Sequence, residues 1–216
     1  MEFSGIGKQS SGKIDGVVTI KGGVYDDLDI DGVCTVEGDL ETQQLKINGV
    51  CTCHGSIAAT DFSCDGVLTV HGNVCVTAID IDGVVTINGG KLEADKIVCD
   101  GVLTTEGEIS ADVIKANGKI SAREIVGDDV TIKSYWSNGF TKLLFKITEK
   151  TGFRFSQIDL IEATTVDLRG VRAKVVNGRN VTIGKNCEIG RVDCSGQLKI
   201  DASAIVREIT GEYTMS

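Results

Sequence analysis

Residues 81–94 read Ile-Asp-Gly-Val-Val-Thr-Ile-Asn-Gly-Gly-Lys-Leu-Glu-Ala, and residues 30–42 follow the same order of residue types. Near the start of this stretch is a pair, Asp or Asn followed by glycine, that recurs seven times at nearly regular spacing between residues 15 and 118. Successive glycines of the pair are 16, 17, 17, 17, 18 and 17 residues apart. A period near 17 residues indicates a repeat fold. The seven glycines are Gly16, Gly32, Gly49, Gly66, Gly83, Gly101 and Gly118.

Each period contains three pairs of mostly apolar residues, and one residue separates the two members of a pair. This spacing is typical of a β-strand, because successive side chains of a strand point to opposite faces. Three short strands make one triangular coil, and stacked coils bury the inward side chains that a single coil leaves exposed. The sequence therefore predicts an all-β fold, a triangular parallel β-solenoid. After Gly83 the pairs are Val85 and Ile87, Leu92 and Ala94, and Ile97 and Cys99.

The corner residues of the coils have a simple interpretation. Glycine after Asp or Asn is expected to supply the positive φ of a tight corner, and the Asp or Asn side chain to cap its own backbone. A calcium site along this acidic column is disfavoured, because the calcium-binding solenoid repeat is a glycine-rich nonapeptide. The absence of proline fits strands in which every residue donates a hydrogen bond to the next coil.

The repeat divides the chain into coils, tails and one insertion. Between residues 117 and 133 the alternation continues, but one face of a coil is predicted to be skipped. Counting pairs gives roughly nine or ten coils, which at one strand spacing per coil make a rod about 45 Å long. The predicted segments are a tail at 1–12, coils at 13–133, an insertion at 134–156, coils at 157–211 and a tail at 212–216.

The insertion is predicted to be an amphipathic helix. Ser137 or Asn138 can cap its start, and Gly152 can end it. Its apolar and basic residues recur at helical spacing on opposite sides. Such a helix can pack against the side or end of the solenoid, or it can dock to an anionic membrane or a partner protein. The candidate docking residues are Trp136, Phe140, Leu143, Leu144, Ile147, Lys142, Lys146 and Lys150.

Composition disfavours several classes of protein. The 216 residues carry a formal net charge of −9, so most of the surface would repel nucleic acid. No run approaches the ~18 consecutive apolar residues of a membrane span, and the first residues lack the regions of a signal peptide. We therefore expect a cytoplasmic protein in which the eight cysteines are free thiols.

Residues that can carry chemistry are few. His54 and His71 occupy equivalent places in adjacent periods, and with Glu37 they can hold zinc, although a solvated ladder of polar residues is the favoured explanation. Seven cysteines occupy inward positions and are expected to be buried, whereas Cys75 is expected to be exposed. A nucleophile elbow and a phosphate loop are both missing. We therefore predict no enzyme activity, catalytic residue, cofactor, metal or small-molecule substrate.

Two outward features favour assembly. Valines directly after the glycines, and threonines two residues further on, form outward columns. These columns either reflect the general β-propensity of Val and Thr or form a lateral contact surface. The coils extend from Ile14 to Ile209, so the end coils present unpaired strand edges and apolar centres. Copies of the chain are therefore expected to stack end to end. The candidate residues are Val18, Ile20, Leu198, Ile200 and Val206.

The order Ile-Asp-Gly-Val-x-Thr-Val-x-Gly-x-Leu/Ile-x-Ala resembles the bactofilins, a bacterial family of polymer-forming cytoskeletal proteins. Residues 173–178 and 180–184 are similar to the longer, Firmicute-type branch, and the resemblance covers most of residues 13–211. It implies a right-handed solenoid that polymerises end to end without nucleotide, often at the inner face of the cytoplasmic membrane. The predicted function is a self-assembling scaffold. The alternatives are a monomeric or dimeric solenoid binding module, and a hexapeptide-repeat transferase, whose coils would be multiples of six residues.

Overall fold

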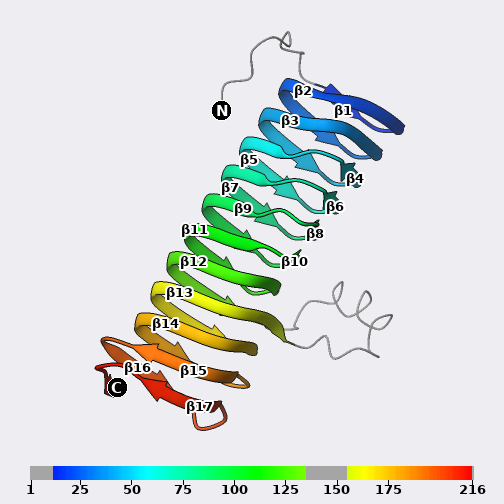
Figure 1. Ribbon diagram of the computed structural model, residues 1–216. Coiled ribbons are helices and arrows are strands. Elements are labelled where there is room, and N and C mark those ends of the chain that lie inside the picture. Colours follow the sequence, from blue (N-terminus) through cyan, green and yellow to red (C-terminus); the bar gives the residue numbers. More distant parts are fainter. Residues whose placement is uncertain (1–11, 135–154, 216) are drawn as a thin grey trace.

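The computed structural model describes residues 12–134 and 155–215, which form an elongated stack of strands with β1 and β17 at opposite ends (Figure 1). Every strand pairing in these residues is parallel. The stack is a β-solenoid of about 11 turns. Equivalent residues of successive turns are about 17 residues apart in the sequence. The predicted all-β parallel solenoid is confirmed.

Short strands cover one face of a coil, and long strands bend at a corner to cover more than one. Each strand pairs with the strand of the next coil on the same face, so successive coils form columns of partner residues. The strands are β1 (Gly12–Ile14), β2 (Val17–Ile30), β3 (Val33–Ile47), β4 (Val50–Cys53), β5 (Ile57–Cys64), β6 (Val67–Val70), β7 (Val74–Ile81), β8 (Val84–Ile87), β9 (Leu92–Cys99), β10 (Val102–Thr105), β11 (Glu108–Ala116), β12 (Lys119–Lys133), β13 (Ser156–Arg169), β14 (Val171–Ile183), β15 (Glu188–Cys194), β16 (Gln197–Ile200), β17 (Ile205–Thr210) and β18 (Thr214–Met215).

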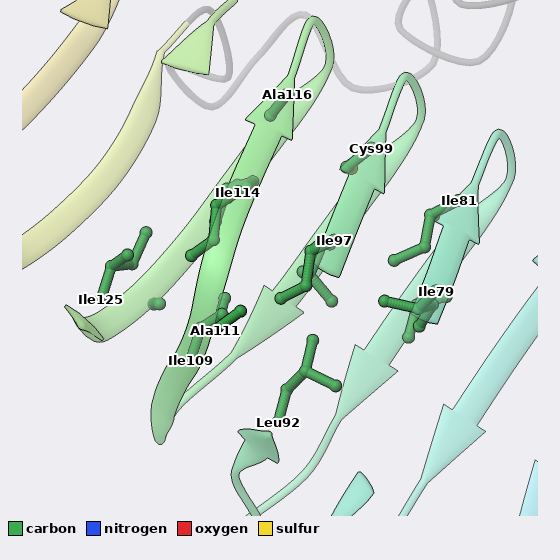
Figure 2. Packing of buried hydrophobic residues seen from close by; sticks show 14 of the residues in the cluster. Ile79, Ile81, Leu92, Ile97, Cys99, Ile109, Ala111, Ile114, Ala116 and Ile125 are labelled. Atoms are coloured by element: carbon green, nitrogen blue, oxygen red, sulfur yellow. The ribbon is translucent and has the colours of Figure 1, made fainter. Parts of the chain in front are cut away.

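The core is the centre of the stack, where inward residues of the three faces meet. Ile79, Ile97 and Ile114 are partners in one column, and each is at most 2% exposed (Figure 2). The inward pairs predicted from the sequence are buried or half-buried along the described repeat, apart from Val18 and Ile209 at the two ends, which are exposed. Because each fully buried apolar side chain contributes roughly 1.5–3 kcal/mol, these columns supply the main stabilisation of the rod.

The corner glycines allow close packing between coils, so the prediction that they supply a positive φ is wrong. None of the seven has a positive φ. A Cβ added at Gly66 would instead overlap the carbonyl oxygen of Gly49 in the preceding coil. The corner Asp and Asn side chains form hydrogen bonds between coils. Asn48 Nδ2 donates a hydrogen bond to Asp31 Oδ1 at 2.7 Å.

The coil formed by β12 has all three faces, so the prediction of a skipped face is also wrong. Its residues 119–121 pair with β10, and its residues 124–132 pair with β11 along the other two faces. Strands β13 and β14 then continue the stack without the Asp-Gly or Asn-Gly pair in register. The observed number of turns, about 11, therefore exceeds the predicted nine or ten. It corresponds to a rod about 53 Å long.

The predicted amphipathic helix lies outside the described residues, except for its two ends. Strand β13 begins at Ser156, so the coils resume one residue earlier than predicted. At the base of the insertion, the Oγ atoms of Ser134 and Ser156 are 2.9 Å apart, and Ser156 Oγ accepts a hydrogen bond from Ile120 N at 3.0 Å. These bonds fix both ends of the insertion at one corner. Within 12–134 and 155–215, no helix is long and apolar enough to cross a membrane.

Candidate interface at the ends of the solenoid

The N-terminal end of the stack has an apolar centre. Val18 is the column partner of Cys34, which is 1% exposed, yet Val18 itself is 41% exposed. Ile20 on the same strand is half-buried and packs against the core. Val18 is exposed because no described strand pairs with β2 on the outer side of this face. This end of the core is therefore open in the described part of the chain.

The rim of the N-terminal end is charged. Lys13 Nζ lies 2.8 Å from Asp31 Oδ2 and 3.6 Å from Asp15 Oδ1. The Lys13 ammonium holds the pKa of the Asp31 carboxyl below its usual range, and the hydrogen bond from Asn48 acts in the same direction. In return, Asp31 raises the pKa of Lys13. The rim of this end is thus polar, around an apolar centre.

The C-terminal end of the stack exposes larger apolar side chains. Ile205 and Ile209 of β17 are 58% and 37% exposed, and Met215 of β18 is 59% exposed. Val206 is half-buried and packs against the core. Among the described residues, the exposed large apolar side chains lie at the two ends or in one column of valines. The two ends are therefore the candidate interaction surfaces.

The sequence-predicted residues for end-to-end contact fall at both ends, with one difference. Val18 and Ile20 lie at the N-terminal end, and Ile200 and Val206 lie half-buried at the C-terminal end. Leu198 is fully buried, because Met215 pairs with it from β18. Sequence reasoning missed the exposure of Ile205, Ile209 and Met215. The exposure of Ile205 and Ile209 could have been predicted, because no further apolar pair follows Ile209 in the sequence.

The predicted docking residues of the insertion, from Trp136 to Lys150, all lie outside the described residues. Their contacts, and the choice between packing on the solenoid and docking elsewhere, stay predictions. The described neighbour Phe155 lies under the Arg172 guanidinium, whose central carbon is 4.1 Å from the ring centroid. This contact and the serine hydrogen bonds place the flanking residues Ser134, Phe155 and Ser156 at the side of the rod and not at an end.

The two histidines stack as their sequence positions predicted. The ring centroids of His54 and His71 are 5.3 Å apart, and the ring planes differ by 13°. Both side chains are exposed. In the described ranges, no group of three or more His, Cys, Asp or Glu side chains is arranged to hold a metal ion. The geometry therefore favours a solvated ladder over a zinc site.

The thiols are arranged as predicted, with seven buried cysteines and an exposed Cys75. Burial raises the pKa of Cys64 and of Cys99 to about 12. Because the thiolate is the nucleophile, thiols with such a pKa are unreactive at neutral pH. The buried cysteines act as small core residues.

The sides of the rod have two weaker candidate surfaces, a column of exposed valines and a shallow hollow. The valines that begin β3, β4 and β6 are 42–46% exposed and form a narrow outward column. A shallow hollow of about 390 Å³ on another face is lined by Lys46, Asp61, Ala78 and Lys96, among others. The lining contains no histidine or cysteine. Neither feature defines a reaction.

No family model, curated protein or solved structure matches the chain. The resemblance of the repeat to the bactofilins therefore stays a prediction. The features that bear on function are therefore the solenoid and its two ends.

Proposed function

We propose that this protein is a self-assembling scaffold whose copies stack end to end into filaments without nucleotide. The observation that supports the proposal is the exposure of inward residues at both ends of the core. Val18 at one end and Ile209 at the other occupy columns that are buried in every interior coil. A second copy placed on either end would bury them, and would also pair the strand edges that each end exposes.

The energetics make such assembly dependent on concentration. Apolar side chains contribute at most roughly 1.5–3 kcal/mol each, and the end residues are already partly buried in one copy. Association costs an estimated 4–15 kcal/mol in lost freedom of motion. Burial at one joint therefore exceeds the cost by a modest margin at best. We expect filaments above a threshold protein concentration and single rods below it.

The proposed partner is a second copy of the chain, and the proposed location is the cytoplasm or the inner face of its membrane. Residues 134–156 are the proposed contact to that membrane or to a recruited protein. Their apolar and basic residues suit an anionic lipid surface. Flotation of the protein with liposomes, with and without anionic lipid, tests this part. Failure to float with either liposome would contradict membrane contact.

Two valines of equal exposure provide a matched test of assembly. Val18 is 41% exposed at the N-terminal end, and Val67 is 42% exposed on the side of the rod. We expect Val18→Glu to abolish filaments, because a carboxylate would have to be buried at the joint. Val67→Glu should leave them intact. Sedimentation velocity and negative-stain electron microscopy measure both, and circular dichroism verifies that each variant is folded.

The control also distinguishes the alternatives. Wild-type protein that stays monomeric at high concentration would contradict the proposal and favour a solenoid binding module. Filaments that survive Val18→Glu but are lost in Val67→Glu would mean that the valine column, and not the end of the rod, is the contact surface.

A further inference from the structure

One column of the core brings two thiols together. Cys34 of β3 and Cys51 of β4 are column partners in adjacent coils, and both side chains are buried. In the described part of the chain, no other strand pairing joins one cysteine to another. Cys64, for example, lies between Ile47 and Ile81 in its column. The pair therefore differs from the other buried cysteines of the described strands.

The two thiols are close enough to form a disulfide. Partners in adjacent coils are one strand spacing apart, about 4.8 Å. The Cα atoms joined by a disulfide are roughly 4.4–6.8 Å apart, so the bond requires no shift of one coil past the other. The side chains already meet, because the Cys51 thiol donates a hydrogen bond to the Cys34 sulfur. Oxidation would replace this hydrogen bond with a covalent bond.

The hydrogen bond makes the two thiols unequal. It lowers the pKa of Cys34, because it stabilises the thiolate of the sulfur that accepts it. The same hydrogen bond, together with burial, raises the pKa of Cys51. Since the thiolate is the nucleophile, Cys34 is the thiol of the pair that reacts first with an oxidant.

Cys34 lies one layer below the open N-terminal end. Its outer column partner is Val18, which belongs to residues 17–21 of β2. That segment pairs with β3, and no described strand pairs with it on the outer side. The register shifts between Lys21 and Gly23, so an irregularity separates the segment from the remainder of β2. A terminal strand with one partner opens locally at a low free-energy cost, which would admit a small oxidant to Cys34.

We infer that Cys34 and Cys51 are a redox site, at which hydrogen peroxide converts the two thiols into a disulfide between adjacent coils. In the first step the Cys34 thiolate attacks one oxygen of the peroxide and the O–O bond breaks. The hydroxide that leaves takes up a proton to become water, and Cys34 becomes a sulfenic acid. In the second step the Cys51 sulfur attacks the Cys34 sulfur and the S–O bond breaks. The S–S bond forms, and a second water leaves with the Cys51 proton.

The reaction passes two electrons from the thiols to the peroxide, and a reducing dithiol restores both thiols by exchange. The disulfide would join β3 to β4 between residues that are 17 positions apart in the sequence. Both thiols belong to one copy of the chain. The inference therefore does not depend on the proposed filament.

Peptide mapping by mass spectrometry tests the inference on the folded chain. In a Cys75→Ser background, the protein at low concentration is treated with hydrogen peroxide and alkylated after denaturation. Of the seven cysteines that remain, we expect two to be lost as thiols, in a disulfide between Cys34 and Cys51 that dithiothreitol reverses. Cys99, in an interior coil, should react at least roughly tenfold more slowly. A pair that stays reduced, under conditions that oxidise Cys75 of the wild-type chain, would overturn the inference.

Two substitutions in β4 provide a matched control. Cys51 and Cys53 are both buried, at 2% and 0% exposure. Valine occurs in each of their columns, at Val85 and Val70 respectively, so either cysteine can be replaced by valine. Cys51→Val should abolish the disulfide, whereas Cys53→Val should leave it intact. Circular dichroism verifies that each variant is folded, and Cys51→Ala is the smaller replacement if Cys51→Val is not.

Trapping the sulfenic acid distinguishes the roles of the two thiols. In Cys51→Val the second step cannot occur, so dimedone, which reacts with sulfenic acids, should label Cys34. In Cys34→Val we expect Cys51 to stay unlabelled, because its burial still disfavours the thiolate. Labelling of Cys51 alone would overturn the assignment of Cys34 as the nucleophile. A disulfide that instead joins Cys53 or Cys64, or one that forms only in urea, would overturn the site itself.

Discussion

The corner at Gly66 and the corner at Gly16 have the same sequence, Asp-Gly, but different surroundings. At Gly66 the carbonyl oxygen of Gly49 lies so close that a Cβ would overlap it. At Gly16 an added Cβ would meet no atom within 4 Å. The interior corner therefore requires glycine, whereas the first corner of a single rod does not. The difference shows that glycine in this repeat serves the contact between stacked coils.

Gly16, in the first corner, therefore leaves room for another coil to pack against it. The inward residues of the same coil are apolar as well, since Val18 and Ile20 continue the buried columns of the interior. The N-terminal end thus has the features of an interior coil on its outer side. This is the physical basis for expecting a second copy there.

Replacing each of these two glycines by alanine should give the largest difference in stability between the interior corner and the first corner. Gly66→Ala forces two backbone segments apart, and we expect a loss of about 2–4 kcal/mol of unfolding free energy. The melting temperature should fall by about 5–15 °C. Gly16→Ala should change the unfolding free energy by less than about 1 kcal/mol. Thermal unfolding followed by circular dichroism measures both, and equal losses would contradict the contact argument.

The buried thiols should also make the stability of the interior depend on pH. Burial raises the pKa of Cys64 and Cys99 from 9.0 to about 12, so the folded chain keeps these protons while the unfolded chain releases them. Their contribution to stability is full below about pH 9 and is lost as the pH rises towards 12. We expect a slope of about 1.4 kcal/mol per pH unit from each thiol.

Denaturant unfolding between pH 8 and pH 11 measures that slope. Cys99→Val should make it shallower than in the wild-type chain. An unchanged slope in Cys99→Val would mean that the inward position of Cys99 contributes nothing to the pH dependence.

The corner side chains should have the smallest effect. Asn48→Asp removes the hydrogen bond to Asp31 and places a carboxylate between Asp31 and Asp65 in the corner column. Because these groups are exposed, we expect a loss of only about 0.5–1 kcal/mol at low salt. Added salt should restore most of it, since screening weakens repulsion between exposed charges. A loss as large as that of Gly66→Ala would show that the corner depends on its side chain and not on the glycine.

The regular part of the fold could be predicted from the sequence because each period repeats the same three inward pairs. The columns through Ile79, Ile97 and Ile114 are visible as a spacing of two within a period near 17. The role of the corner glycine could not be predicted in this way. A glycine selected for close approach and a glycine selected for positive φ look the same in sequence.

The ends were harder to predict than the interior. Leu198 belongs to one of the last apolar pairs of the repeat, so the sequence places it at the C-terminal end. The two residues of β18 are too few to show any period, and the burial of Leu198 under Met215 was missed for that reason. The coils of β13 and β14 lack the corner glycine pair in register, and their number was underestimated for that reason.

End-to-end assembly can be observed by electron microscopy of the wild-type chain over a range of concentrations. We expect unbranched filaments one solenoid wide, which lengthen with concentration and repeat along their axis at about 53 Å, the length of about 11 strand spacings. Single rods of that length at every concentration would contradict end-to-end assembly.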